Sequence, residues 1–355
     1  MDKSIITYSK GIAVNLTHLC RNHCGYCGYR NDEEDLLVPY TTIKSCKKAR
    51  KNNSREVLIM AGERPDRSNT IRSKLDVWGF ESYIDYVYAV CELIFLEGML
   101  PNLNIGYISE REIKVIRRIA PAITVLLESG SQEFLSQKVH KNAPYKTLDS
   151  RIEVIRNAGI YKVPVTTGVM VGIGETQKNL RDAFEIIKDI HQELGHIQNV
   201  VIQNFVPKPN TQLAALKPPA KAEMLEAVKL AHKILPEEII ITIPLNLNPD
   251  FLPFIQAGVR DLGMVDLEYD VLAPDRAWPD LKKVEKQLKA KGWGFQRRLP
   301  IFAKYIRDNW YSRKLSQLLD KYRLMIKQAE ERNENNSAAD KKGKSTAASG
   351  KKRKK

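Results

Sequence analysis

The sequence predicts an α/β protein built on a closed (βα)8 barrel, a TIM-barrel-like fold, and two observations support this prediction. Short apolar, β-branched runs alternate with amphipathic segments about eight times, a pattern that joins parallel strands through right-handed crossovers. Polar or glycine positions follow the C-terminal ends of different runs, at Glu63, Glu128, Gly172 and Asn204. In a barrel these ends converge on one mouth, where active sites are built. A doubly wound open sheet is the alternative.

The expected strands share a short length and a richness in Val, Ile and Leu, which suits strands buried on both faces. They are Ile12–Leu16, Val57–Ala61, Leu103–Tyr107, Ile123–Leu127, Val165–Val171, Val200–Phe205, Ile239–Ile243 and, with a weaker pattern, Met264–Leu267.

The segments between these runs show the 3.6-residue period of helices with one apolar face. Thr176 can cap a helix that Gly195 ends. The other expected helices are Tyr83–Phe95, Glu112–Ala120, Asp149–Ala158 and Ala222–Leu235. We interpret their apolar stripes as core packing.

Composition divides the chain into three parts. Residues 1–300 carry the strand–helix alternation, residues 301–332 are expected to form a C-terminal helical extension, and residues 333–355 are predicted to be a disordered, Lys-rich tail. The tail holds eight Lys and Arg against two acidic residues, which is +6 of the net charge of +15. The remaining excess is mild, so we expect no nucleic-acid binding beyond nonspecific contacts of the tail.

The composition, with 43% hydrophobic and 28% charged residues, is that of a soluble globular protein and excludes a disordered, collagen-like or disulfide-scaffold chain. No apolar run approaches the roughly 18 residues of a membrane span. Residues Met1–Lys10 lack the apolar core of a signal peptide. We therefore expect a cytoplasmic protein without membrane association.

Three of the five cysteines, Cys20, Cys24 and Cys27, lie within eight residues directly after the first expected strand. Without an export signal, such a cluster indicates metal binding rather than disulfides. Three thiolates in CxxxCxxC spacing can hold three corners of a cubic iron–sulfur cluster and leave the fourth iron open. S-adenosylmethionine can chelate that iron through its amino and carboxylate groups, and an electron from the cluster then cleaves the sulfonium.

A structural zinc site is the alternative interpretation of the same loop, with His18 or His23 as the fourth ligand. Cys46 and Cys91 are expected to be non-ligand residues, because both stand alone and Cys91 lies on an apolar helix stripe.

Three motifs in this order resemble the radical S-adenosylmethionine (SAM) superfamily: the CxxxCxxC loop, Gly62-Glu63, and Gly168–Glu175. The resemblance implies a radical SAM fold, a [4Fe–4S] cluster on Cys20, Cys24 and Cys27, and bound SAM. The residues that it implies around SAM are Tyr26 beside the adenine, Gly62 and Glu63 at the methionine amino group, Glu128 at the ribose hydroxyls, Gly172 and Glu175 in the adenine loop, and Arg151 at the carboxylate. A solvated helix arginine is the alternative for Arg151.

Further motifs over nearly the whole expected barrel, among them Gly62–Pro65, Gln203–Pro209 and Arg298–Pro300, are similar to the 7,8-didemethyl-8-hydroxy-5-deazariboflavin synthase family in its CofG-type form. The resemblance implies an ammonia-releasing lyase of deazaflavin coenzyme biosynthesis that acts on an adduct of tyrosine's hydroxybenzyl group with a ribityl-bearing uracil. It also implies a separate CofH-type subunit that supplies the adduct, because the chain is too short for both synthase halves, and a reduced electron donor.

Five residues are candidates for substrate contact. Asn204 offers both a donor and an acceptor to a uracil-like edge, with a strand-end cap as the alternative. Lys208 can meet an anionic or ribityl group, or be an exposed loop lysine. Thr166 and Thr167 are weaker candidates, since Thr is common in strands for packing alone. Asp261 is the polar position that survives where Arg260–Asp266 departs from the family pattern.

Two other functions remain open from the sequence. One is a different biotin-synthase-like radical SAM enzyme, either the CofH-type subunit or a menaquinone-pathway enzyme. The other is a zinc-containing nucleic-acid-binding protein, suggested by the basic tail and the cysteine loop; it predicts bound zinc and salt-dependent binding.

Overall fold

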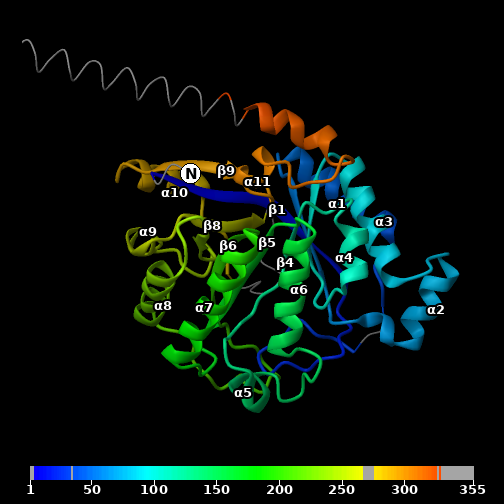
Figure 1. Ribbon diagram of the computed structural model, residues 1–355, viewed down its shortest axis with the longest axis horizontal. Helices are drawn as coiled ribbons and strands as arrows, with labels where there is room; N and C mark the ends of the chain where they lie inside the picture. Colours follow the sequence, from blue (N-terminus) through cyan, green and yellow to red (C-terminus); the bar gives the residue numbers. More distant parts are fainter. Residues whose placement is uncertain (1–3, 33–34, 267–275, 326–327, 329–355) are drawn as a thin grey trace, which may run out of the picture.

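Eight parallel strands close into a barrel because each pairs with the next in chain order and the first also pairs with the eighth (Figure 1). The computed structural model describes residues 4–32, 35–266, 276–325 and 328. The strands are β1 (Ile5–Thr17), β2 (Glu56–Ala61), β3 (Leu100–Asn104), β4 (Ala122–Thr124), β5 (Val165–Val171), β6 (Ile197–Asn204), β7 (Ile240–Thr242) and β8 (Asp261–Asp266). The prediction of a closed (βα)8 barrel, rather than a doubly wound sheet, is confirmed.

The helices surround the strands and bury their apolar faces against them (Figure 1). They are α1 (Pro39–Lys51), α2 (Asn69–Val77), α3 (Tyr83–Leu96), α4 (Glu110–Ile116), α5 (Gln132–Phe134), α6 (Leu148–Ile160), α7 (Gln177–Leu194), α8 (Lys221–Ile234), α9 (Leu252–Ala257), α10 (Leu281–Lys289) and α11 (Ala303–Arg307). As predicted, the Thr176 hydroxyl caps α7 by accepting from the Asn179 N–H, and Gly195 ends that helix at φ 66°.

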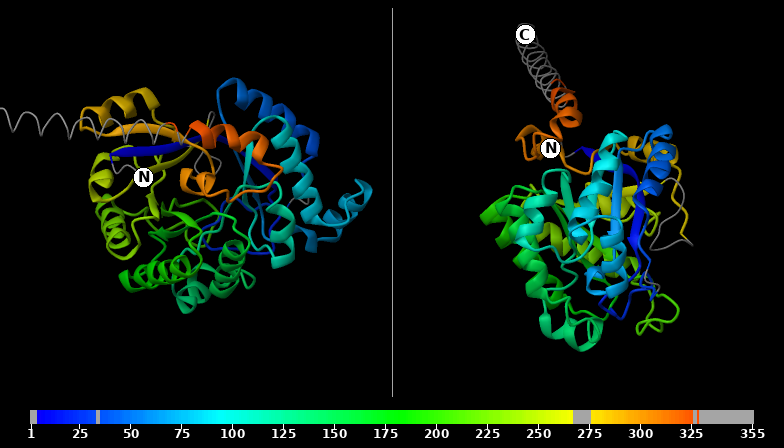
Figure 2. Two further views of the ribbon diagram at one scale, coloured as in Figure 1. Left: turned by 45° about the horizontal axis from the view of Figure 1, so that its top comes forward. Right: turned by 90° about the vertical axis from the view of Figure 1, so that its right-hand side faces the viewer.

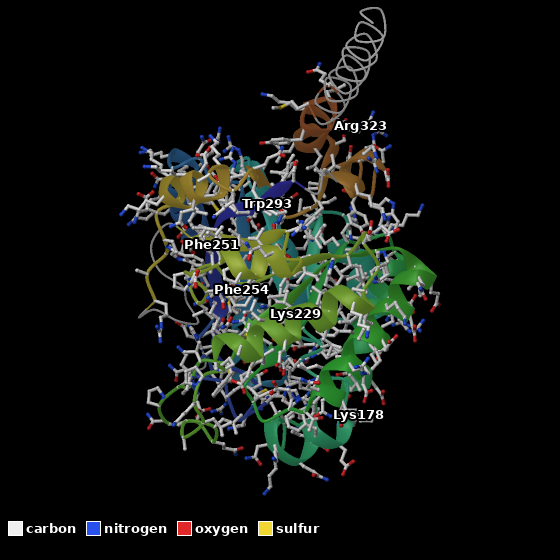
Figure 3. All side chains as sticks on the ribbon, turned by 90° about the vertical axis from the view of Figure 1, so that its left-hand side faces the viewer. Lys178, Lys229, Phe251, Phe254, Trp293 and Arg323 are labelled. Carbon is white, nitrogen blue, oxygen red and sulfur yellow. The ribbon has the colours of Figure 1, made fainter. Side chains whose placement is uncertain are left out.

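Buried and exposed positions alternate along the outer helices. Phe251 and Phe254, at the start of α9, are each 1% exposed, whereas Lys178 of α7 and Lys229 of α8 lie in solvent (Figure 3). The aromatic pair therefore anchors α9 to the barrel.

A ninth strand, β9 (Gly294–Arg298), pairs in parallel with the first half of β1, so both segments lie at one end of the barrel (Figure 2). The sequence does not predict this strand, because Gly-Phe-Gln-Arg-Arg has no apolar run and its residues are half-buried or exposed. Beyond β9 the chain forms α11 and a helix over residues 316–325. Three parts of the prediction lie outside the described residues. They are Leu267 at the end of the eighth expected strand, residues 326–327 and 329–332 of the expected helical extension, and the expected tail, 333–355.

Within the described ranges, none of the helices combines the length and apolar composition needed to span a bilayer.

The N-terminal half of the barrel interior is polar, where barrels of this type are usually filled by Val, Ile and Leu. Each of the eight strands contributes to a layer of side chains joined by hydrogen bonds, which we call the polar layer. Its members are Thr7, Ser9, Glu56, Asn102, Thr124, Thr166, Asn199, Thr242 and Asp261. Arg298 of β9 completes it by donating to both oxygens of Asp261, at 2.7 and 2.9 Å.

Histidine burial in α7 makes fold stability depend on pH. The His191 side chain accepts a hydrogen bond through Nδ1 from the Ile197 N–H at 3.2 Å, and burial, with the charge of Lys304, lowers its pKa to about 4. The unfolded chain takes up this proton near pH 6.5. The unfolded state thus binds more protons between pH 6.5 and pH 4, and stability is lost as the pH falls through that window.

Replacing His191 with Asn should reduce this pH dependence. Between pH 7 and pH 5 we expect the free energy of unfolding, measured by urea denaturation, to fall by about 1–2 kcal/mol more in the wild type than in His191→Asn. An equal fall in the two proteins would contradict the assignment.

Candidate active site

A cavity of about 670 Å³ opens at the C-terminal ends of the strands and brings together ten of the fifteen residues that the sequence predicts for the cluster, SAM and substrate. These ten are Cys20, Cys24, Tyr26, Cys27, Gly62, Glu63, Glu128, Arg151, Asn204 and Lys208. They come from loops after β1, β2, β4 and β6 and from α6, so residues that are far apart in the chain meet at one mouth, as the barrel predicts.

The cysteine loop follows β1 directly and is held against the loop after β2. The Cys20 sulfur accepts hydrogen bonds from the backbone N–H groups of Asn22 at 3.4 Å and Glu63 at 3.1 Å. Cys20, Cys24 and Cys27 are all unpaired and half-buried, whereas Cys46 and Cys91 are fully buried in α1 and α3. The three loop sulfurs are thus the ones that face the cavity.

The donor set fits a cluster better than a single zinc ion. Within the described residues, no three Cys, His, Asp or Glu side chains converge on one point that could hold a metal ion. His18 faces the Tyr29 carbonyl at 2.8 Å through Nδ1, and His23 is exposed. Zinc requires all its ligands at about 2.0–2.3 Å from one centre, whereas a cubic cluster takes each thiolate on a different iron. Burial raises the pKa of Cys24 to about 12, and coordination to iron would hold it as thiolate.

Gly62 allows the close approach of the two loops. A Cβ at this position would lie 2.0 Å from the Leu19 carbonyl oxygen and 2.7 Å from Cys20 Cβ. Since the nearest atom is backbone, no side-chain rotation can relieve the contact. Glycine is therefore required where the Gly-Glu motif meets the cysteine loop.

Replacing Gly62 with Ala should displace the cysteine loop and lower the iron bound per chain after anaerobic reconstitution. Gly294→Ala is the matched control, because a Cβ there would meet only ordinary contacts of 3.4 Å or more; we expect it to bind as much iron as the wild type. Equal iron content in the two variants would contradict the role of Gly62.

Glu63 and Arg151 form a buried ion pair at the cavity wall. Arg151 Nη2 donates to Glu63 Oε2 at 2.5 Å, and the Tyr107 N–H donates to Oε1 at 2.8 Å. Burial alone would lower the pKa of Arg151, but the charge of Glu63 outweighs this and raises it. Arg151 is 4% exposed, and its Nη1 has no partner within the described residues. Arg151 is therefore not a solvated helix arginine, and it keeps a donor available to an anionic ligand.

Glu128 lies in the left-handed region at φ 68° and collects three donors. Its carboxylate accepts from Tyr26 OH, from Lys146 Nζ, and from His140 Nε2 at 2.8 Å. Burial alone would raise the pKa of Glu128, but the charges and hydrogen bonds of Lys146 and His140 hold it far below the ordinary value. Lys146 also lines the cavity and donates to Tyr26 OH at 2.6 Å. No sequence pattern marks Lys146, because it lies in a loop with neither a motif nor a helical period.

Two of the five remaining residues, Gly172 and Glu175, shape the loop after β5 without lining the cavity. Glu175 accepts from the N–H groups of Gly172 at 3.0 Å and Ile173 at 2.9 Å. Gly172 has φ 99°, and a Cβ there would lie 2.7 Å from the Pro219 ring. Gly172 and Glu175 thus set the shape of this loop, and the contact of the loop with the adenine of SAM remains a prediction.

Thr167 and Asp261, both expected to contact substrate, do not line the cavity. The Thr167 side chain is fully buried and faces away, whereas its neighbour Thr166 faces the barrel interior. Asp261 is 0% exposed and belongs to the polar layer, where it accepts from Arg298 and from Thr7 at 2.6 Å. The geometry gives both residues structural roles. Strand alternation points the Thr167 side chain away from the barrel interior, and the ion pair with Arg298 engages both carboxylate oxygens of Asp261.

Asn204 and Lys208 line the cavity with partners of their own. Asn204 exchanges two amide hydrogen bonds with Asn248, at 3.1 and 2.7 Å. Lys208 lies against Gly28 of the cysteine loop, where an added Cβ would come within 2.8 Å of its side chain. Lys208 is half-buried, so it is not an exposed loop lysine.

Comparison with known proteins identifies the class. Residues 14–187 match the Radical SAM superfamily. Among solved structures, the barrel is similar to a hydrogenase maturase, HydG (TM-score 0.67, 14% identity, 94% of this chain and 83% of that one), and to methylornithine synthase (TM-score 0.62, 17% identity, 83% and 84%). The fold and the cysteine loop therefore define a radical SAM protein.

Relatives with higher identity narrow this further. The chain is 36% identical over 320 residues to the 7,8-didemethyl-8-hydroxy-5-deazariboflavin synthase of Archaeoglobus fulgidus, covering 90% of this chain and 97% of that one. It is also 36% identical over 316 residues to the enzyme of that name from Methanocaldococcus jannaschii, covering 88% of each chain. The chain belongs to the 7,8-didemethyl-8-hydroxy-5-deazariboflavin synthase family.

Proposed function

We infer that the protein is the CofG-type half of 7,8-didemethyl-8-hydroxy-5-deazariboflavin synthase. It converts 5-amino-5-(4-hydroxybenzyl)-6-(D-ribitylimino)-5,6-dihydrouracil, a small-molecule adduct derived from tyrosine, to the deazaflavin chromophore and releases ammonia. The observation that supports this most strongly is the 36% identity to a synthase over 90% of the chain, combined with a single cavity that holds the cysteine loop, Glu63 and Glu128.

The cofactors that membership in this class implies are a [4Fe–4S] cluster and SAM, and the residues around the cavity suit both. Cys20, Cys24 and Cys27 would hold the cluster. When bound and reduced, the cluster with SAM would supply the radical chemistry needed to remove a hydrogen atom from the benzylic carbon of the adduct.

The two acidic positions at the cavity would then bind SAM from two sides. Glu63 would accept from its ammonium group, while the Nη1 donor of Arg151, which has no partner within the described residues, would reach its carboxylate. Glu128 would accept from the ribose hydroxyls, with Tyr26 and Lys146 fixing the orientation of its carboxylate.

Two further proteins belong to this proposal. A CofH-type subunit must supply the adduct, because the proposed reaction begins after the hydroxybenzyl group has joined the uracil. A reduced electron donor must deliver the electron that first reduces the cluster, and the second electron that the adduct loses on becoming the chromophore would return to the cluster.

The test is an anaerobic reaction of reconstituted protein with SAM, a reductant, tyrosine, 5-amino-6-(D-ribitylamino)uracil and a known CofH-type enzyme. We expect deazaflavin fluorescence that depends on this chain. Formation of 5′-deoxyadenosine without deazaflavin would contradict the proposed substrate and retain the radical chemistry.

A further inference from the structure

A second cavity, of about 200 Å³, lies inside the barrel beside the polar layer, and we call it the inner cavity. It shares five lining residues with the larger cavity, so the two adjoin. These are Met60, Asn104, Thr124, Leu126 and Gln203. A molecule whose reacting atom lies in the larger cavity can thus extend a branch into the inner one.

Apolar atoms form the larger part of the inner cavity's surface, and hydroxyl, amide and charged side chains are set into it. Members of the polar layer face the cavity from six neighbouring strands, β2 to β7: Glu56, Asn102, Thr124, Thr166, Asn199 and Thr242. Hydrogen bonds to neighbours fix the orientation of these side chains. Thr166 Oγ1, for example, donates to Asn199 Oδ1 at 2.7 Å and accepts from Gln198 Nε2 at 3.3 Å. Thr and Asn side chains offer more donor and acceptor sites than these bonds use.

Asn104 at the end of β3 stands out at the junction of the two cavities. It lines both, it is half-buried, and its side chain forms no hydrogen bond to any part of the chain that the structure describes. Opposite it, Gln203 donates through Nε2 to the Asn204 carbonyl at 3.2 Å and has its side-chain oxygen available. The entrance to the inner cavity therefore carries amide groups able to bind a ligand.

We propose that the inner cavity binds the polyhydroxylated ribityl chain of the substrate, with Asn104 and Thr166 as determinants of that specificity. This rests on the proposed function. Every hydroxyl of a ribityl chain both donates and accepts, which matches a wall of amides and hydroxyls. A hydroxybenzyl ring in the same place would cover these groups without pairing them, which costs about 1–3 kcal/mol for each.

The last strand of the barrel also reaches this cavity. Gly263, Met264 and Asp266 of β8 line it, and a Cβ at Gly11 would lie 2.6 Å from the Met264 sulfur. β8 therefore forms one wall of the proposed ribityl site.

The experiment compares two probes that differ in the polyol alone: 5-amino-6-(D-ribitylamino)uracil and 5-amino-6-(methylamino)uracil. Their dissociation constants are measured by anaerobic calorimetry on cluster-loaded protein without reductant, so that no turnover occurs. We expect the wild type to bind the ribityl compound at least about tenfold more tightly. Thr166→Val and Asn104→Leu should each reduce that ratio about fivefold, the loss expected for one hydrogen bond.

Thr167→Val is the matched control, because it removes a hydroxyl from the adjacent residue, which faces away from both cavities. The ratio should stay at the wild-type value. Thermal melting checks that each variant folds. If Thr166→Val does not fold, the ratio of the two dissociation constants in the wild type and in Asn104→Leu tests the proposal.

Equal binding of the two probes by the wild type would overturn the proposal, as would an unchanged ratio in folded Thr166→Val and Asn104→Leu. Deazaflavin formation by the wild type is measured separately. Product without a ribityl preference would reject the inner-cavity site alone, whereas a ribityl preference without product would reject the proposed function and leave a ribityl-binding site.

Discussion

Replacing Cys24 with Ala is expected to abolish both the visible absorption of the reconstituted protein and the formation of 5′-deoxyadenosine from SAM. Cys24 is one of three cavity-lining thiols, and within the described residues no fourth group can take its place, because His18 is engaged with the Tyr29 carbonyl and His23 is exposed. Two thiolates cannot hold a cluster that already leaves one iron without a protein ligand. Iron and sulfide content and 5′-deoxyadenosine yield, measured together, check this.

Cys46→Ala is the matched control for Cys24→Ala. Cys46 is buried in α1 and does not line the cavity, so its loss should lower stability through packing and leave iron content and 5′-deoxyadenosine yield unchanged. If Cys24→Ala retained full iron and activity, the cluster would have to be held by other residues.

Replacing Lys146 with Met is expected to lower the free energy of unfolding by about 3–5 kcal/mol, because it leaves the carboxylate of Glu128 buried without its main counter-charge. The Glu128 side chain is 3% exposed, and Lys146 Nζ contacts its Oε1. Lys114→Met removes one partner of an exposed pair with Glu110 and should change the free energy of unfolding far less, because solvent screens that pair. Chemical denaturation measures the free energy of unfolding of each variant. Lys146→Arg keeps the positive charge and should recover most of the stability that Lys146→Met loses.

The same substitution should change the response to acid. Because Lys146 and His140 hold the pKa of Glu128 low against the opposing effect of burial, the stabilisation is complete above the unfolded pKa near 4.3 and is lost as the pH falls below it. Lys146→Met raises the folded pKa of Glu128, so its stability should fall less steeply between pH 5 and pH 3. A slope equal to that of the wild type would contradict the pairing.

The order of elements in this barrel could be predicted because its strands are apolar runs and its helices have caps. The strand expected at Val165–Val171 has the same bounds as β5. The strand expected at Leu103–Tyr107 is instead β3, Leu100–Asn104. Its start could not be predicted, because Pro101 lies inside the strand and a proline in the sequence argues against one. Helix α1 was not expected, since its buried face consists of Thr42, Cys46 and Ala49, which give too weak an apolar stripe.

The site was predictable where chemistry leaves a local pattern, as in CxxxCxxC and Gly-Glu. Lys146 and the amide of Asn248 were missed because their significance comes from partners far along the chain, 18 residues away at Glu128 and 44 at Asn204. Thr166 and Thr167 are equal candidates in the sequence, because composition does not reveal which of two adjacent strand residues faces inward; a one-residue change of register exchanges the two faces.

The position of β1 in the barrel has a consequence for how the protein is made. Its first half contacts β9, its middle contacts β8, and its second half runs into the cysteine loop. Thr7 and Asp261, which hydrogen-bond to each other, are 254 residues apart, and pairings this distant form late because loop-closure entropy must be overcome first. The second half of β1, next to the cysteine loop, pairs with the nearby β2, whereas the barrel closes only when β8 pairs with β1. We therefore expect the three thiols of the loop to stay open to solvent and oxidants in the nascent chain until the barrel closes.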